Sequence, residues 1–283
     1  MTELETICGQ SDAKLRALSE AIASCGSALV AFSGGVDSTF LLRVAREVLQ
    51  ERCVALLALS ASVPERERAE ARALAATIGA RLVVEESREV ENPAYVRNDV
   101  DRCYHCKSEL FALTERARAE LGLAVVFDGF NADDRRDWRP GHQAARENRV
   151  RSPLAEAGLT KVEIRAWSKQ LGLPTWDKPQ MACLASRLPY GTEVTIERLA
   201  QVGGAEQALF ELGLRQFRVR HHGEVARLEV AEEEYEKLFD PALRMQASQA
   251  LKARGFKFVA LDLEPFRSGR MNEAAKADAA NVP

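Results

Sequence analysis

Two kinds of segment alternate along the first half of the chain. One kind is short and apolar almost throughout, at residues 28–33, 54–60, 81–87 and 124–130. The other is longer, with apolar residues at helical spacing, at residues 39–49, 65–79 and 107–121. Strands that are apolar on both sides are typical of a parallel sheet covered by helices on both faces, with right-handed crossovers. The pattern predicts an α/β fold whose ligands bind at the carboxyl ends of the strands.

The second half predicts a different arrangement. Residues 158–174 are predicted to contain a helix. Thr160 and Glu163 have the spacing of a capping box at its start, and Gly172 with Pro174 marks its end. Residues 175–195 lack periodicity and are interpreted as an ordered loop at a domain boundary. A small α+β unit with a hairpin follows: helices at 196–213, 232–239 and 243–255, and strands at 216–222, 224–230 and 257–264. We therefore expect a first domain at 1–178, a second at 179–272 and a disordered tail at 273–283.

Composition narrows the class of protein. The chain has 283 residues, 46% of them hydrophobic and 29% charged, which is ordinary for a globular protein. The formal net charge of -3 disfavours a protein that binds nucleic acid through positive charge alone. The first residues lack the basic start and apolar core of a secretory signal, and no run is long enough to span a bilayer. We expect a cytoplasmic protein with no membrane partner.

The turn after the first apolar run carries the clearest chemistry. "SGGVDS" places two glycines, Gly34 and Gly35, where the backbone can approach an anion at the positive end of a helix. Ser33 and Ser38 add hydroxyl donors. Asp37 would repel a phosphate unless a cation such as Mg²⁺ lay between them. The stretch therefore predicts a pyrophosphate cradle with a metal-binding carboxylate; the alternative is a tight turn without a ligand.

Other polar residues follow neighbouring strands of the predicted sheet. Ser60 ends the second apolar run, and the fourth leads into "DGFNADD". The carboxyl ends of parallel strands share one rim, so these side chains are candidates to contact the bound ligand or its metal ion. They are Ser60, Asp128, Asn131 and Asp133.

The cysteines fall into two groups. Cys8, Cys25 and Cys53 lie in predicted helices or at a strand start and are interpreted as small buried or half-buried hydrophobic residues. Cys103 and Cys106 form a C-x-x-C pair just ahead of a predicted helix, where both thiolates could face one metal, act as a redox pair, or be structural. Cys183 lies in the interdomain loop, four residues before Arg187, whose charge could stabilise a thiolate nucleophile. Three cysteines would leave one iron of a [4Fe–4S] cluster open to an extra sulfide.

These motifs resemble known families. "SGGVDS" after an apolar strand resembles the PP-loop of the ATP pyrophosphatases, which adenylate a substrate and release pyrophosphate. With "RCYHCKSELF", "MACLASRLPYG", "FRVRHHGEVARLEV" and "DLEPFRSGRMN" in order behind it, nearly the whole chain resembles the ATP-dependent sacrificial sulfur transferases of nickel-pincer cofactor synthesis for lactate racemase. The resemblance implies a PP-loop, adenine nucleotide alpha hydrolase-like domain followed by a small α+β domain. It also implies ATP and Mg²⁺, with Asp37 as the magnesium residue.

The resemblance implies a reaction and its residues. Family members adenylate a carboxylate of pyridinium-3,5-biscarboxylic acid mononucleotide and convert it to a thiocarboxylate. Cys183 matches the cysteine that attacks the acyl adenylate and, in single-cysteine members, gives up its sulfur and becomes dehydroalanine. Members with three cysteines are thought to use a [4Fe–4S] cluster as a reusable sulfur carrier, which here implies Cys103, Cys106 and Cys183 as ligands. The source of the sulfur is not implied. Trimers or hexamers are the implied assemblies.

Two arginines match the phosphate-binding strand of that family. Arg218 and Arg220 are two apart on a predicted strand, share a face, and can both bind one phosphate. The alternative is a pair of solvated arginines on an edge strand. The end of the chain departs from the family, because Pro265 and Phe266 stand where Gly and Tyr are usual. Neither the pattern nor the resemblance assigns a role to His105, Arg139 or Arg267.

Three other functions compete with this one. A tRNA thiolase could use three cysteines and a [4Fe–4S] cluster, but no RNA-binding module or basic face is evident. A nitrogen-transferring PP-loop enzyme would need a glutaminase domain, and the three cysteines would then have no role. A nucleotide sensor would bind ATP without releasing pyrophosphate, which makes poor use of a turn that keeps its aspartate and both serines.

Overall fold

The computed structural model describes residues 3–136, 140–179 and 182–267, so the predicted tail at 273–283 and Arg139 lie outside the described residues. The chain forms two compact units. The first comprises Met1–Glu89 and Cys103–Met181, and the second comprises Val90–Arg102 and Ala182–Pro283. The later boundary lies near the predicted division at residue 178. The predicted first domain is nevertheless interrupted, because residues 90–102 belong to the second unit.

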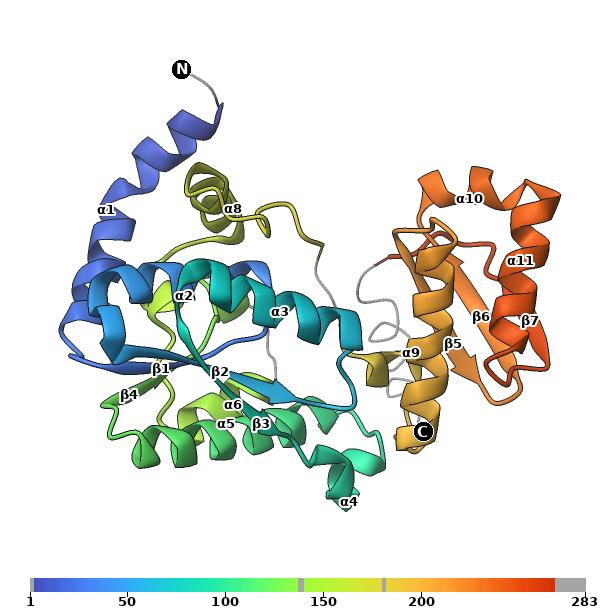
Figure 1. Ribbon diagram of the computed structural model, residues 1–283, viewed down its shortest axis with the longest axis horizontal. Helices are drawn as coiled ribbons and strands as arrows, with labels where there is room; N and C mark the ends of the chain where they lie inside the picture. The colour runs from blue at the N-terminus through green and yellow to red at the C-terminus, as the bar shows by residue number, and fades with distance from the viewer. Residues whose placement is uncertain (1–2, 137–139, 180–181, 268–283) are drawn as a thin grey trace, which may run out of the picture. The chain divides into compact units, whose positions relative to one another are not determined.

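The first unit contains a four-stranded sheet in the order β3-β2-β1-β4, and each neighbouring pair is parallel (Figure 1). The predicted α/β fold is confirmed. β1 and β4 are shorter than the apolar runs that predicted them. The strands are β1 (Ala28–Ala31), β2 (Cys53–Leu59), β3 (Arg81–Glu86) and β4 (Val125–Phe127).

Helices cover both faces of this sheet, with α2 and α3 on one face and α5 and α6 on the other (Figure 1). Side chains alternate along β1: Val30 packs with Phe40 of α2, whereas Leu29 packs in the opposite layer with Ala117 of α5. This two-sided burial explains the near-continuous apolar runs. The helices are α1 (Glu3–Ala23), α2 (Val36–Leu49), α3 (Glu65–Ile78), α5 (Arg102–Glu120), α6 (Pro140–Glu147), α7 (Pro153–Glu156) and α8 (Lys161–Gln170).

The strand order creates a switch point between β1 and β4. The chain proceeds outward from β1 through β2 to β3 and then returns to form β4 on the other side of β1. Connections that leave β1 and β4 in opposite directions open a crevice at the carboxyl ends of these two strands. The turn at 33–35 and the segment from Asp128 onward therefore flank the same crevice.

The second unit contains a three-stranded sheet in the order β5-β6-β7. β5 and β6 form the predicted antiparallel hairpin, in which Arg220 lies opposite Arg227, and β6 pairs with β7 in parallel. Helix α9 packs on β5, and α11 packs on β7 and α9. These elements are α9 (Ile196–Glu211), β5 (Phe217–His222), β6 (Val225–Val230), α10 (Glu232–Leu238), α11 (Pro241–Lys252) and β7 (Phe258–Leu261).

Residues 90–102 complete the second unit from a distant part of the chain. They contain the short helix α4 (Pro93–Val96), capped by the Asn92 side chain, which accepts a hydrogen bond from the Ala94 N–H (2.9 Å). The Val194 N–H donates to the carbonyl oxygen of Val96 (2.9 Å), which ties this segment to the residues before α9. Arg102, the last residue of the segment, is also the first residue of α5.

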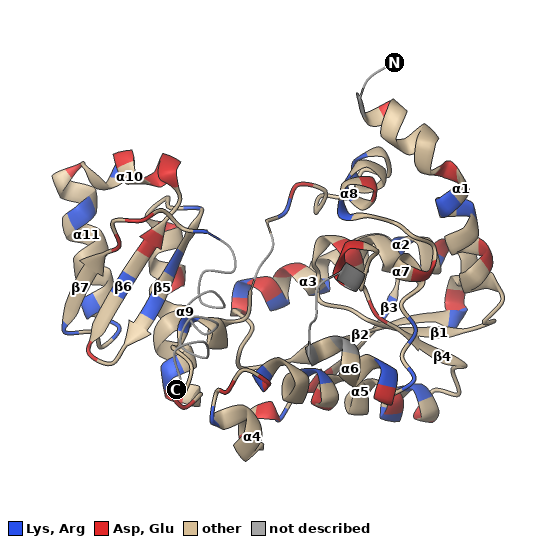
Figure 2. Ribbon diagram, turned by 180° about the vertical axis from the view of Figure 1, so that it is seen from behind, with Lys and Arg blue, Asp and Glu red and all other residues tan. Residues whose placement is uncertain are grey.

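Charged side chains of both signs are mixed along the helices, as Figure 2 shows for α3 and α5. In α3 the sequence "ERERAEAR" pairs Glu65 with Arg68 and Arg66 with Glu70. Acidic residues gather on α10, which begins with three glutamates. Within the described residues, no helix has both the length and the apolar character needed to cross a membrane.

The turn between β1 and α2 requires glycine at residue 34. Gly34 has φ +71°, and a Cβ there would lie 2.9 Å from the Cβ of Ala71 in α3. Gly79 has the similar φ of +72° but open space around it. Left-handed conformation alone costs a non-glycine residue about 1–2 kcal/mol, and overpacking adds about 1–3 kcal/mol.

We therefore expect Gly34→Ala to lower the free energy of unfolding by roughly 1–3 kcal/mol more than Gly79→Ala does. Urea denaturation followed by circular dichroism measures both variants. Equal losses in the two variants would show that the turn does not pack tightly against α3.

Candidate functional site

The turn after β1 is shaped as a phosphate cradle. Gly35 is the N-cap of α2, and the hydroxyls of Ser33 and Ser38 lie 3.1 Å apart across the turn. The Gly35 N–H donates to Ser33 Oγ (3.4 Å), and Ser38 Oγ donates to the Gly35 carbonyl (3.3 Å). The first N–H groups of a helix have no partner within the helix and carry the positive end of its dipole. Backbone donors and two hydroxyls thus face one small region, as the sequence predicted.

Asp37, in the first turn of α2, is held by two side chains. The Asn131 amide donates to Asp37 Oδ1 (3.2 Å), and Lys161 forms an ion pair with Asp37 Oδ2. Asp133 accepts a hydrogen bond from the backbone N–H of Lys161 (2.8 Å), which fixes the start of α8 beside the cradle. The structure brings Asn131 to Asp37, and the Asp133 N–H in turn donates to Asn131 Oδ1 (2.9 Å).

Asp128 follows β4 and is 5% exposed. Its Oδ1 accepts a hydrogen bond from the Phe130 N–H (3.2 Å). Burial raises the pKa of this carboxyl to about 6, against the opposing effect of hydrogen bonds from Ser152 and the Phe130 N–H. Asp128 therefore shares the rim with the cradle, as expected, in a partly desolvated environment.

Ser60 has a local partner that the sequence did not suggest. Its hydroxyl donates to Glu89, and Ser87 donates to the other oxygen of the same carboxylate. Glu89 is 1% exposed. Ser60 Oγ also accepts a hydrogen bond from the Ser62 N–H (2.9 Å). These contacts fix the turn after β2 against the end of β3.

The C-x-x-C pair lies inside a helix. Cys103 and Cys106 belong to the first two turns of α5, which begins at Arg102, so the prediction of a pair just ahead of the helix is corrected. Residues three apart on a helix share a face. Cys103 is exposed and Cys106 half-buried, so the thiols are accessible to a ligand. Among the described side chains, no group of three or more His, Cys, Asp or Glu residues could hold a metal ion.

The other three cysteines of the first unit are buried or half-buried, as predicted. Cys8 and Cys53 are buried, and burial raises the pKa of Cys53 to about 12. Cys25 is half-buried and accepts a hydrogen bond from Arg151 Nη1 (2.9 Å). None of the three shares an element with the C-x-x-C pair.

Cys183 belongs to the second unit, where it precedes the short 3₁₀ helix η4 (Leu184–Arg187) and is half-buried. Arg187 is fully buried and forms a two-point ion pair with Glu206 (2.8 and 3.0 Å). Its Nη1 donates to the carbonyl oxygens of Ala182 (2.8 Å) and Cys183 (3.2 Å). In the described contacts Arg187 thus holds the backbone of the cysteine turn, rather than its sulfur.

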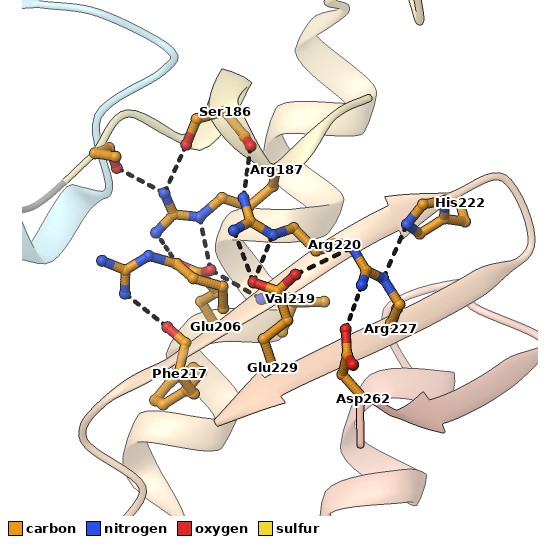
Figure 3. A network of polar contacts seen from close by, with 12 residues as sticks. Ser186, Arg187, Glu206, Phe217, Val219, Arg220, His222, Arg227, Glu229 and Asp262 are labelled. Carbon is orange, nitrogen blue, oxygen red and sulfur yellow. Dashed lines mark hydrogen bonds and ion pairs between the residues drawn. The ribbon is translucent and has the colours of Figure 1, made fainter. Parts of the chain in front are cut away.

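Arg218 and Arg220 are buried, at 7% and 6% exposed, although β5 is an edge strand. The alternative of two solvated arginines is therefore wrong. Arg220 donates to Glu229 Oε2 (2.9 and 2.7 Å) and to the Ser186 carbonyl (2.8 Å), as Figure 3 shows. Arg218 stacks on the ring of Phe266 (4.5 Å), and its pKa is lowered to about 10 by burial and by the charge of Arg187.

The side chains that hold these predicted residues escaped the sequence analysis. Glutamates on α9 and β6 sit in predicted helix and strand patterns that give no sign of burial. Lys161 directly follows the predicted N-cap Thr160, where a basic residue is unfavourable beside the positive helix end, and this was the one available signal. The missed residues are Glu89, Lys161, Glu206 and Glu229.

The ion pair of Arg187 and Glu206 gives a stability prediction. Removing one partner of a buried pair leaves the other charge uncompensated, at a cost of about 3–5 kcal/mol. We expect Arg187→Met to lower the free energy of unfolding by that amount. Lys257→Met, which removes an exposed partner of Glu224, should cost less than about 1 kcal/mol. Comparable losses in the two denaturation curves would contradict the buried pairing.

Asp128 gives a pH prediction. Its folded pKa of about 6 lies above the ordinary pKa of an aspartate, 3.8. The stability contributed by the neutral carboxyl is therefore fully present below about pH 3.8 and is lost as the pH rises through about 6. Relative to Asp128→Asn, the wild-type free energy of unfolding should fall by about 2–3 kcal/mol between pH 4 and 7. A difference that stays constant over this range would exclude the raised pKa.

Comparison with known proteins supplies the family. No protein-family model matches the chain. It is 43% identical over 261 residues to an uncharacterized protein of Synechocystis, covering 92% of this chain and 97% of that protein. It is 36% identical over 245 residues to the pyridinium-3,5-bisthiocarboxylic acid mononucleotide synthase of Lactiplantibacillus plantarum, covering 86% and 88%. An uncharacterized protein of Methanocaldococcus jannaschii is 28% identical over 240 residues.

The similarity to the synthase runs through both units and agrees with the parallel sheet and cradle described above. It confirms the resemblance found in the sequence motifs. An identity of 36% over 86% of the chain is sufficient to assign the chain to the family of the synthase. The chain belongs to the sacrificial sulfur transferase family of lactate racemase cofactor biosynthesis.

Proposed function

We propose that the protein is an ATP-dependent sulfur transferase that converts carboxylates of pyridinium-3,5-biscarboxylic acid mononucleotide to thiocarboxylates. The observation that carries the proposal is the cradle at 33–38, with Asp37 beside it, at the switch point of a parallel sheet. The relative from Lactiplantibacillus plantarum, named as a synthase of the bisthiocarboxylic acid mononucleotide, supplies the substrate class.

The first unit would bind and activate ATP. The N–H groups at the start of α2 and the hydroxyls of Ser33 and Ser38 are suited to the phosphates, because they combine hydrogen-bond donors with the positive helix end. Asp37 would hold Mg²⁺, which requires it to release Lys161 or share it with a phosphate. Attack of a substrate carboxylate oxygen on the α-phosphorus forms the acyl adenylate and releases pyrophosphate.

The second unit would bind the substrate and supply sulfur. Arg218 and Arg220 are candidates for the nucleotide phosphate, because a dianion would offset the cost of burying neighbouring guanidinium groups. The Cys183 thiolate would attack the acyl carbonyl, form a thioester and displace AMP. Loss of the cysteine Hα with cleavage of its Cβ–S bond then leaves the thiocarboxylate on the substrate and dehydroalanine in the chain.

The C-x-x-C pair supports a reusable version of this step. Cys103 and Cys106 share one face of α5 near its N-terminus, which suits them as two ligands of a [4Fe–4S] cluster, with Cys183 as the third. Such a cluster would supply exchangeable sulfide, so that Cys183 would not be consumed. A homo-oligomeric assembly and a cytoplasmic location stay predictions.

A tRNA thiolase is less well supported. The mixed charges of α3 and α5 offer no basic surface there for an RNA backbone. The match to the synthase covers 86% of the chain and extends over both units.

Pyrophosphate release tests the nucleotide chemistry. With ATP, Mg²⁺ and the pyridinium dicarboxylate mononucleotide, we expect Asp37→Asn to lower the rate at least about a hundredfold, since a metal-binding carboxylate stabilises the transition state by several kcal/mol. Asp12→Asn, on the exposed face of α1, is the matched control and should retain the wild-type rate. Equal rates in the two variants would reject the assigned role of Asp37.

The fate of sulfur is tested by mass. Protein purified without oxygen after iron and sulfide reconstitution should form several thiocarboxylates per chain with an unchanged protein mass if a cluster carries the sulfur. Loss of one H₂S at Cys183 after a single turnover would instead show a sacrificed cysteine. The absence of both thiocarboxylate and pyrophosphate would reject the proposed function.

A further inference from the structure

We propose that Asn98 and Arg102 form a clamp that positions the turn carrying Cys183 for sulfur transfer. The clamp is defined by these two side chains, and the segment that it holds, residues 182–195, is called the Cys183 loop. The inference deepens the proposed function and rests on it. Both partners of every contact used below belong to the second unit.

Asn98 holds the distal half of the Cys183 loop. It is completely buried, and its side-chain nitrogen donates to the carbonyl oxygens of Pro189 (2.8 Å), Thr192 (2.9 Å) and, more weakly, Leu188 (3.4 Å). The backbone carbonyl of Asn98 accepts a hydrogen bond from the Gly191 N–H (3.2 Å). One residue thereby contacts backbone groups along a stretch with no regular secondary structure, in which the Pro189 carbonyl also accepts the Thr192 N–H (3.0 Å).

Asn98 makes these contacts from an unfavourable backbone conformation. Its φ is +59°, in the left-handed region, which only a few per cent of non-glycine residues adopt. Asparagine tolerates this region better than most residues. Strained conformations of this kind persist only where the surroundings over-determine them, and they gather at functional sites. The strained conformation of Asn98 therefore favours a role for this residue beyond packing.

Arg102 connects Asn98 to the cysteine turn itself. Its Nη1 donates to Asn98 Oδ1 and to the carbonyl oxygen of Ala185 (3.0 Å), two residues after Cys183. Arg102 is 5% exposed, so these bonds are shielded from water. Arg187 holds the carbonyls of Ala182 and Cys183 from the other direction. The turn that carries the nucleophile is thus fixed on both sides of Cys183.

This arrangement suits a nucleophile that must meet a reactive acyl adenylate. A displacement of about 1 Å at the reacting atom can cost a hundredfold in rate. The contacts of the clamp given above lie within the second unit, whereas the cradle belongs to the first. Loss of the clamp should therefore impair sulfur transfer while adenylation continues. A merely structural role would lower both half-reactions together.

The principal variant is Asn98→Gly, which removes the side-chain bonds while accepting the positive φ. Asn92→Ala is the control, because it removes an exposed helix cap in the same segment and leaves the clamp intact. Arg102→Lys is a milder variant that keeps the charge, for use if Asn98→Gly does not fold. The Val194 to Val96 backbone bond remains in all of them.

Three quantities are measured in each variant: pyrophosphate released, thiocarboxylate formed per pyrophosphate, and hydrogen exchange together with thiol alkylation of the peptide containing Cys183. In Asn98→Gly we expect pyrophosphate release within about twofold of wild type, at least a tenfold fall in thiocarboxylate per pyrophosphate, and faster exchange and alkylation at 182–192. Asn92→Ala should match wild type in all three.

Two results would overturn the proposal. One is a thiocarboxylate yield per pyrophosphate that stays at the wild-type value while the loop exchanges faster, and the other is unchanged exchange and alkylation in both clamp variants. Failure of the proposed function is distinguishable, because wild-type protein would then form no thiocarboxylate, whereas exchange and alkylation would still report whether Asn98 and Arg102 hold the loop.

Discussion

Guanidinium groups buried in the second unit impose the strictest constraint on its structure. A charge removed from water is tolerated only with a counter-charge and filled hydrogen bonds. Glu206 and Glu229 meet this demand for Arg187 and Arg220, and Glu206 also accepts the Val219 N–H (3.1 Å). The network therefore joins α9, both strands of the hairpin and the cysteine turn (Figure 3). Displacing any one of these elements would leave a buried charge without its partner.

The two units prepare for anions in different ways. In the first, the main donors are backbone N–H groups at a helix start, and Asp37 forms an ion pair with Lys161. In the second, the donors are buried side chains, and burial together with the charge of Arg187 lowers the pKa of Arg218 to about 10. Under the proposed function, the first arrangement would bind a nucleotide together with Mg²⁺, and the second would bind a single phosphate without a metal.

The sequence was most informative where chemistry follows from the order of residues along one element. The parallel sheet, the hairpin, the Thr160 capping box and the cradle all depend on local spacing, and each was predicted. The ion pair of Lys161 with Asp37, the Glu89 contacts and the Asn98 bonds join residues far apart in the chain, and no periodicity encodes them. The sequence pattern places the start of α5 too late. Cys103 and Cys106 fit a C-x-x-C motif ahead of a helix, and in the structure they lie within its first turns.

The second unit is discontinuous, and this determines when it can form during synthesis. Asn98 is separated from its carbonyl partners by 90 to 94 residues, so the donors leave the ribosome long before the acceptors. By then the chain contains every strand of the first sheet. Once that unit has folded, residues 103–181 no longer act as a long flexible loop. Bringing the two separate pieces of the second unit together then costs less conformational entropy. The second unit thus assembles last, after the first unit has brought its two pieces of chain together.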